Sequence, residues 1–244
     1  MPLHALISDI HGNIDALNAV LSDIENQKAD NIVCLGDMIG YGGAPGACLR
    51  SIRDRCSIVL MGNHEAFTFM PFDIDQFSPR VGRGIEKARE ELTPEEIDWI
   101  SQLPIISELD GTDLVHASLD TPVEFHHVLS KRDAKQHFSF QKTSVCFNGH
   151  THIPAVFKQT GPKVEINKPL STPTPLDKNC RYLINVGSVG QPRDGDNRAC
   201  YVLFDSESLT ITYRRIPYDI EAAQQRFQQA EMHPSVWKRI AKGT

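Results

Sequence analysis

The chain has 244 residues, with 31 acidic and 25 basic side chains and a formal net charge of −6 at pH 7. This length allows a sizeable core, and the composition is that of a globular protein without a fibrous or low-complexity repeat. The acidic balance gives no basic field for gathering nucleic acid, so a phosphate-bearing ligand must be attracted locally, for instance by bound cations. We therefore expect no general nucleic-acid binding.

The N-terminal stretch MPLHALISDIHGN lacks a basic region followed by a long apolar one, and no apolar run approaches the roughly 20 residues that span a bilayer. We therefore expect a cytoplasmic protein without membrane association. The six cysteines form no CxxC pair. Three of them lie in apolar runs, where a reduced thiol packs as a small hydrophobic group, namely Cys34, Cys146 and Cys200.

Five short apolar runs each end in a polar cluster. In chain order, HALIS runs into Asp9 and His11, NIVCL into Asp37, SIVLM into Asn63 and His64, TDLV into His116, and SVCF into His150 and His152. Between the first three runs, apolar residues recur at helical spacing in 14–24 and in PGACLRSIRDRC. This alternation predicts parallel strands with covering helices, in which ligands bind beyond the carboxyl ends of the strands. The polar clusters lie at those ends.

The middle segment, about 66–104, has a different pattern. TPEEIDWISQLP predicts a helix with Thr93 as its N-cap, Pro94 in its first position and Glu96 completing a capping box. The aromatic, proline-broken stretch FTFMPFDIDQFSPRVGRG precedes it. This stretch either covers a site near His64 as a loop or short helices, or forms an ordinary surface crossover.

The rest of the chain contains further strand candidates spaced by turn residues: AVFKQ, KVEIN, RYLINVGSV, CYVLFD and LTITYRRI. They suggest a second, more antiparallel half, followed by a helix in DIEAAQQRFQQAEM. Because no linker or internal repeat interrupts the sequence, we expect one domain over 1–244, with 66–104 as a helical insertion near the site.

The residue types in the polar clusters favour a metal site. Carboxylates, imidazoles and an amide oxygen suit Mn, Fe, Zn or Co better than Ca²⁺, which prefers oxygen ligands alone. Taken singly, each cluster has an ordinary explanation as a turn or helix cap, although HxH favours metal because alternate residues of an extended segment face the same way. Five of the ten histidines fall at predicted strand ends, and this coincidence indicates a common site.

The same residues, in the same order, resemble the calcineurin-like metallophosphoesterases. The match comprises Asp9-x-His11, Gly36-Asp37, Gly62-Asn63-His64-Glu65, His116 and Gly149-His150-x-His152. The phrase NVGSVGQPRDGD further resembles the small bacterial phosphodiesterase-like branch of that family. The resemblance implies an α/β fold, a four-layer α/β/β/α sandwich of two mixed sheets flanked by helices.

The resemblance also implies roles for the matching residues around two divalent or trivalent cations. Asp9, His11 and His152 would bind one cation, Asn63, His116 and His150 the other, and Asp37 both. Such a pair can share a deprotonated water that attacks phosphorus, so the implied activity is hydrolysis of phosphodiesters or small phosphomonoesters, nucleotides included. His64 would face the substrate and assist the leaving group.

One departure from a sequence motif of the family narrows the range of expected substrates. Protein Ser/Thr phosphatases and bis-nucleoside tetraphosphate hydrolases of this superfamily carry GDxxDRG or a close relative, whereas Asp37 here leads into GDMIGYGG. Without that arginine, Tyr41 and Arg193 are the available substitutes for contacting substrate, together with Asn63 and His64. A Ser/Thr phosphatase-like enzyme is therefore less favoured. A non-catalytic interaction scaffold, as in the retromer subunit of this fold, is disfavoured by the intact ligand set.

Several polar residues keep a structural and a functional explanation side by side. Asn13 fits a helix N-cap better than a substrate contact, and Glu65 either orients a histidine at the site or is solvated. The remaining histidines are expected to be surface or packing residues; they are His4, His126, His127, His137 and His233.

Overall fold

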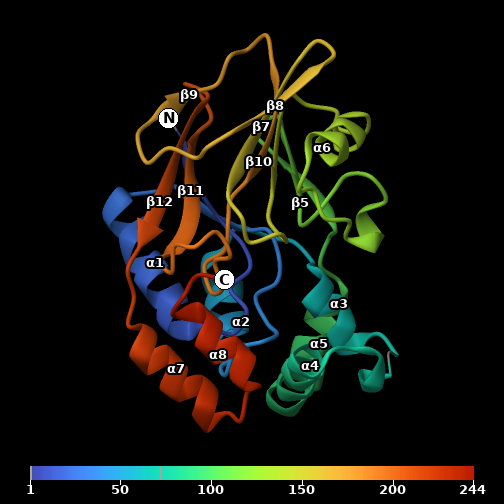
Figure 1. Ribbon diagram of the computed structural model, residues 1–244, viewed down its shortest axis with the longest axis vertical. Helices are drawn as coiled ribbons and strands as arrows, with labels where there is room; N and C mark the ends of the chain where they lie inside the picture. The colour runs from blue at the N-terminus through green and yellow to red at the C-terminus, as the bar shows by residue number, and fades with distance from the viewer. Residues whose placement is uncertain (1, 72) are drawn as a thin grey trace.

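Two mixed β-sheets lie face to face in the computed structural model, which describes residues 2–71 and 73–244 (Figure 1). The first sheet has the strand order β3-β2-β1-β11-β12-β9, with bounds Leu3–Ile7 (β1), Asn31–Cys34 (β2), Ile58–Val59 (β3), Thr174–Pro175 (β9), Ala199–Asp205 (β11) and Thr210–Ile216 (β12). The second has the order β4-β5-β6-β10-β7-β8, with bounds Ile106–Leu109 (β4), Thr112–Val115 (β5), Val145–Asn148 (β6), Ala155–Thr160 (β7), Lys163–Asn167 (β8) and Arg181–Asn185 (β10).

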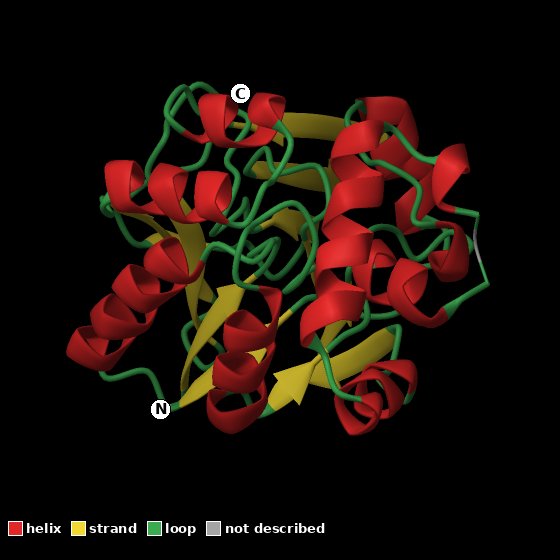
Figure 2. Cartoon of the chain, turned by 90° about the horizontal axis from the view of Figure 1, so that it is seen from below, coloured by secondary structure: helices red, strands yellow, loops and turns green. Residues whose placement is uncertain are grey.

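Helices flank the two sheets. The helices of the described residues are Ile14–Gln27 (α1), Pro45–Arg55 (α2), Asn63–Phe69 (α3), Pro79–Glu91 (α4), Pro94–Ser101 (α5), Lys131–Phe138 (α6), Ile220–Gln229 (α7) and Pro234–Ile240 (α8), with short 3₁₀ turns at Ile74–Gln76 (η1) and Pro122–Glu124 (η2). In Figure 1, α1 and α6 lie on opposite sides of the paired sheets. Seen from below, helices surround a central group of loops (Figure 2).

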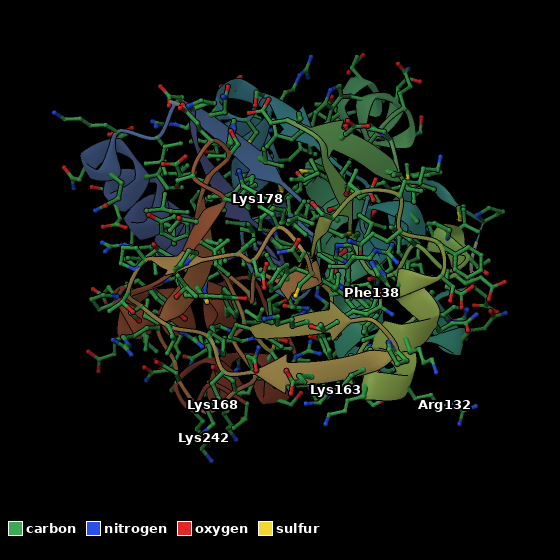
Figure 3. The ribbon with its side chains drawn as sticks, turned by 90° about the horizontal axis from the view of Figure 1, so that it is seen from above. Arg132, Phe138, Lys163, Lys168, Lys178 and Lys242 are labelled. Carbon is green, nitrogen blue, oxygen red and sulfur yellow. The ribbon has the colours of Figure 1, made fainter. Side chains whose placement is uncertain are left out.

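The two-residue period of the strands explains the four layers. In β1, Leu6 packs into the core between the sheets, whereas Ile7 packs with the residues of α1 and α2. In β6, Phe147 faces the other sheet and Cys146 packs with α6, where Phe138 is buried (Figure 3). Because both faces of each sheet are apolar, each sheet must be covered twice. The predicted α/β/β/α sandwich is confirmed.

The strand directions confirm one part of the sequence-based prediction and correct another. β1, β2 and β3 are parallel neighbours, as expected, and β5, β6 and β10 form a second parallel set. The later strands do pair in antiparallel fashion, but they do not form a separate half. β11 and β12 extend the first sheet, while β7 and β8 extend the second.

The middle segment is mostly helical, with α3, η1, α4 and α5; its position 72 lies outside the described residues. The predicted capping box is present: Thr93 Oγ1 accepts a hydrogen bond from the Glu96 amide at 3.2 Å, and the Glu96 carboxylate accepts one from the Thr93 amide at 2.9 Å. Asn13 caps α1, as expected, by accepting a hydrogen bond from the Ala16 amide at 3.2 Å. Both caps satisfy helix amides that have no partner inside the helix.

The cysteines in the predicted strands are buried, as expected. Cys34, Cys146 and Cys200 are buried free thiols, and burial raises the pKa of Cys200 to about 12. None of the helices in residues 2–71 and 73–244 combines the length and the hydropathy that crossing a lipid bilayer requires.

Asp23 ties α1 to the first sheet and provides a test of the packing. Its carboxylate accepts hydrogen bonds from the Arg214 guanidinium at 2.7 and 3.0 Å and from the Tyr201 hydroxyl at 2.6 Å. Partial burial alone would raise the pKa of Asp23, but these hydrogen bonds outweigh it and hold the pKa below its ordinary value of 3.8.

We expect Asp23→Asn to lower the free energy of unfolding at pH 7 by about 1 kcal/mol, a modest value because the pair remains in contact with water. A depressed carboxyl pKa contributes stability that is complete above the unfolded pKa, near 3.8, and is lost as the pH falls through the folded pKa. Urea unfolding between pH 7 and pH 2 should therefore show the two proteins converging in acid. Asp54→Asn, on the exposed part of α2, is the control and should match the parent protein throughout.

Candidate metal centre

The loops that follow five strands meet at one end of the sandwich. Asp9, Asp37 and Asn63 follow β1, β2 and β3, which are neighbours in the first sheet. His116 and His150 follow β5 and β6, which are neighbours in the second sheet. Since parallel strands present their carboxyl ends at the same edge, each sheet delivers its polar residues to one place, and the packing of the sheets brings the two sets together.

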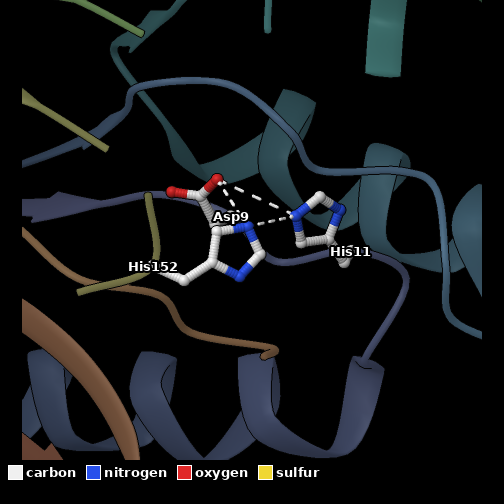
Figure 4. A group of neighbouring side chains, drawn as sticks. All are labelled: Asp9, His11 and His152. Carbon is white, nitrogen blue, oxygen red and sulfur yellow. Dashed lines mark hydrogen bonds and ion pairs between the residues drawn. The ribbon is translucent and has the colours of Figure 1, made fainter. Parts of the chain in front are cut away.

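Asp9, His11 and His152 form the first group of possible ligands (Figure 4). Asp9 Oδ1 lies 3.3 Å from His152 Nε2 and 3.8 Å from His11 Nε2, and the two nitrogens are 3.0 Å apart. The three atoms thus converge on one point that a cation could occupy.

Asp37, His116 and His150 form the second group. Asp37 Oδ2 lies 3.4 Å from His116 Nε2, which is 3.2 Å from His150 Nδ1. The same oxygen of Asp37 is 3.7 Å from His11 Nε2, in the first group. Asp37 therefore stands between the two groups and faces both.

Unpaired buried atoms support a fit to cations. Asp9 Oδ1, Asn63 Oδ1 and His150 Nε2 are buried atoms for which the described part of the chain supplies no hydrogen-bond partner. Buried polar atoms nearly always have a partner, and the two oxygens are electron-pair donors, as is an imidazole nitrogen that carries no proton. Their chemistry suits a divalent cation of the Mn, Fe, Zn or Co type.

Three imidazoles are oriented in the same way. In each, Nδ1 donates to a backbone carbonyl: His11 to Ile39 at 3.1 Å, His116 to Leu35 at 2.9 Å and His152 to Gln191 at 2.7 Å. A carbonyl can only accept, so the proton of the neutral ring is on Nδ1 and the lone pair of Nε2 points into the centre.

In each aspartate, one carboxylate oxygen accepts a backbone hydrogen bond and the other faces the nitrogen donors of the centre. Asp9 Oδ2 accepts a hydrogen bond from the His150 amide, and Asp37 Oδ1 accepts one from the His64 amide, both at 2.9 Å. Burial alone would raise the pKa of both aspartates, but the neighbouring histidines, chiefly His152 and His116 respectively, lower the pKa of each below its ordinary value. Both therefore stay ionised near neutral pH.

Electrostatics differ among the histidines. Burial lowers the pKa of His116, but the Asp37 carboxylate outweighs it and raises the pKa to about 9. Burial and the neighbouring His116 lower the pKa of His150 to about 3, and burial also lowers the pKa of His64. His150 is thus neutral at pH 7, the form that binds metal, and a cation that binds His116 must displace its proton.

Glu65 plays a different part from the one predicted. Its buried carboxylate contacts no histidine through a hydrogen bond; it accepts four backbone N–H bonds, from Asp37, Met38, Ile39 and Gly62, at 2.7, 2.9, 3.2 and 2.9 Å. Burial and the Asp37 charge raise the pKa of Glu65 to about 7. Glu65 therefore fixes the backbone of the Asp37 loop and joins it to the start of α3.

The backbone of the centre is strained. Asp9, His11, Asp37, His150 and His152 all have left-handed φ values, between 50° and 66°. Each costs about 1 kcal/mol or more for a residue with a Cβ, and such residues concentrate at functional sites. Hydrogen bonds between loops hold this geometry, including the His11 amide to the Asp37 carbonyl at 2.9 Å.

Two glycines of the motifs are required by close approach. A Cβ on Gly62 would lie 2.2 Å from Asp37 Oδ1, and a Cβ on Gly149 would lie 2.1 Å from Ser8 Oγ and 2.5 Å from Asp9 Oδ2. Both distances are far below van der Waals contact, so the glycines before Asn63 and His150 let the carboxylates reach the centre.

A pocket of about 120 Å³ opens onto the centre, and the predicted substrate residues line it. They are Tyr41, Asn63, His64 and Arg193. The Tyr41 ring lies 4.6 Å from the His64 ring, and the Arg193 guanidinium lies over Tyr41 at 5.9 Å. Arg193 is positioned by its amide, which donates to the His152 carbonyl at 3.1 Å.

His127 was expected to be a surface or packing residue, and it does lie on the surface, where it also borders the small pocket. Its ring centre lies 4.1 Å from that of His150. It comes from the loop after η2 and follows no strand, so the strand-end pattern could not identify it; the adjacent histidines His126 and His127 were the available hint. The other histidines lie on the surface or pack elsewhere, as His4 does against Asp110.

Comparison with known proteins identifies the family. Residues 3–209 match the model of the calcineurin-like phosphoesterase superfamily domain. The chain belongs to this metal-dependent family. It is 34% identical over 243 residues to an uncharacterised protein of Methanocaldococcus jannaschii, a match that covers 98% of this chain and 97% of that one.

Solved structures agree with this assignment. A metallophosphoesterase from Sphaerobacter thermophilus is 31% identical, with a TM-score of 0.89 over 100% of this chain and 99% of that one. A hypothetical protein from Pyrococcus horikoshii OT3 is 18% identical, with a TM-score of 0.81 and the same coverage, and shows that the fold is shared. Histidines and aspartates that could hold metal ions are thus clustered in a chain of the calcineurin-like phosphoesterase family.

We expect Glu65→Gln to weaken Mn²⁺ binding by about ten- to hundredfold, the usual cost of losing a group that supports metal ligands. The amide cannot accept four N–H bonds, so the Asp37 loop should move. Isothermal titration calorimetry of stripped protein measures the affinity.

Glu96→Gln is the matched control, because Glu96 is a buried carboxylate that binds backbone N–H at the start of α5, in a capping box away from the centre. Equal Mn²⁺ affinity in the two variants would contradict the role given to Glu65.

Proposed function

We propose that the chain is a binuclear metal-dependent phosphoesterase that hydrolyses phosphodiesters or small phosphomonoesters, nucleotides among them. The observation that carries this proposal is the position of Asp37, whose Oδ2 faces His116 at 3.4 Å and His11 at 3.7 Å. A carboxylate between two groups of imidazole nitrogens suits a pair of cations that share one ligand.

The proposed ligands follow the two groups. Asp9, His11 and His152 would hold one ion and Asn63, His116 and His150 the other, with Asp37 between them. The ions would be Mn, Fe, Zn or Co. When bound, such a pair supplies an activated hydroxide and positive charge for the phosphoryl oxygens.

His64 is proposed to act on the substrate rather than on the cations. It lines the small pocket, and its Nδ1 has no hydrogen-bond partner in the described residues. Its backbone amide is tied to Asp37 Oδ1, so the ring has a set position relative to the centre. Donation of a proton from this ring to the leaving oxygen would prevent build-up of charge there.

Arg193, Tyr41 and Asn63 are proposed to contact the phosphate ester. Arg193 contributes a guanidinium, which suits phosphate oxygens, and its buried Nε has no partner in the described residues. Asp37 here leads into GDMIGYGG, without the arginine of the GDxxDRG motif of related Ser/Thr phosphatases. A phosphoprotein phosphatase is therefore the less favoured alternative, and so is a non-catalytic scaffold.

We expect metal-stripped protein given Mn²⁺ to hydrolyse bis(p-nitrophenyl) phosphate, and His64→Ala to lower kcat by about 10²- to 10⁴-fold, because a proton donor is lost while the cations remain. p-Nitrophenolate release measures kcat, and calorimetry measures Mn²⁺ binding. His233→Ala, at the start of α8, is the control and should retain activity. Absence of turnover with any metal and any ester would favour the scaffold instead.

We expect parent protein to bind two Mn²⁺ per chain. His152→Ala should abolish one binding event, since this ring belongs to one group, whereas Asp37→Ala should weaken both, since its carboxylate faces both. Stoichiometry from calorimetry and from metal analysis after gel filtration distinguishes these outcomes. A single ion in the parent protein, or retention of one tight ion in Asp37→Ala, would contradict the bridging role.

A further inference from the structure

A second, larger pocket of about 450 Å³ lies beside the proposed centre. Its walls are largely apolar and come from α3 and the η2 loop: Ala66, Phe67 and Met70 on one side, and Val123 and Phe125 on the other. This volume falls within the range of roughly 300–1,000 Å³ that is usual for small-molecule sites.

The apolar pocket is continuous with the centre. Asn63, His127 and His150 line both it and the small pocket at the centre. A phosphorus atom held at the centre would therefore have one ester arm directed past these three residues into the apolar pocket. A polar pocket of about 430 Å³, which contains Arg132, lies on the other side of His126 and His127 but shares neither Asn63 nor His150.

The charges in the apolar pocket restrict what it can hold. Among the described residues that line it there is no lysine or arginine. At its rim, the Glu124 carboxylate lies 2.9 Å from the His126 ring, and both side chains are about half exposed. A second phosphate or a carboxylate placed here would meet Glu124 without a compensating cation, so an uncharged arm is favoured.

The rings in the pocket favour a planar arm. Phe67, Phe125, His126 and His127 all contribute to its lining, and the Phe67 ring lies 5.9 Å from the ring of His64. Aromatic walls bind flat groups by stacking, as proteins do with nucleobases.

We propose that this apolar pocket binds an uncharged aromatic arm of the phosphate ester, so that the substrate class is an aryl or nucleoside phosphoester. The inference rests on the proposed function for the position of the phosphate, and it adds the determinants of specificity. Contacts with Val123, Met70 and Phe125 determine which arm binds, while the centre binds the phosphate.

The test compares phosphonates that differ in one arm. Calorimetry of Mn²⁺-loaded protein should show phenylphosphonate binding at least about tenfold more tightly than methylphosphonate, the scale of discrimination that an apolar pocket provides. Thymidine 5′-methylphosphonate should share this advantage. n-Hexylphosphonate has as many carbons as phenylphosphonate and serves as the alkyl comparison. If it binds more tightly than phenylphosphonate, the pocket prefers an alkyl arm to an aromatic one, and the proposal is overturned.

Two variants locate the effect. Val123→Asp and Met70→Glu alter side chains that are 63% and 41% exposed, so neither should disturb folding. Each should reduce the preference for phenylphosphonate to within about threefold of methylphosphonate, because a carboxylate in the pocket opposes the apolar arm. Leu170→Asp, at a residue 53% exposed and outside this pocket, is the matched control and should keep the full preference.

These outcomes separate the two proposals. Equal binding of phenylphosphonate and methylphosphonate, or an unchanged preference in Val123→Asp and Met70→Glu, would overturn the aromatic-arm proposal even if diesters are hydrolysed. A clear aromatic preference that both variants abolish would support it even if no ester is turned over, in which case the proposed function would be the one that fails.

Discussion

The candidate centre depends on the placement of one buried carboxylate, that of Asp37, between nitrogen donors that belong to two different sheets. A buried charge is costly unless it is paired, and here His116 and His11 lie on either side of it. The carboxylate cannot adjust its own position, since Oδ1 is tied to the His64 amide and the loop amides around it are bound by Glu65. Because the Asp37 carboxylate is fixed, its distances to the ligand groups on either side are fixed as well.

Rigidity of the centre has a cost in backbone energy that the rest of the fold offsets. Left-handed φ values at five polar residues would not persist in isolated loops, because extended or helical conformations are more favourable. They persist here because the five loops are hydrogen-bonded to one another and rest on sheets with apolar cores on both faces. Anchoring of three imidazoles through Nδ1 has the same effect on the side chains, so little reorganisation is needed to receive cations.

Reaction chemistry and substrate selection come from different parts of the chain. The strand ends contribute the groups that would hold cations and phosphate. The walls of the adjoining apolar pocket come instead from α3 and the η2 loop, segments that belong to neither sheet. The residues of these segments that face only the apolar pocket can change in sequence without disturbing the centre, so the same fold can host different ester preferences.

The sequence by itself determined the strands other than β4 and β9, the caps at Asn13 and Thr93, and the polar residues that follow the strands, because each of these depends on local spacing. The rule that parallel strands share an edge then brings those polar residues together. Only the tertiary structure decided how the later strands divide between the two sheets, what Glu65 binds, and that His127 reaches the site. These features depend on which segments pack together, and some of those segments are far apart in the sequence. Neither periodicity nor residue type identifies such long-range partners.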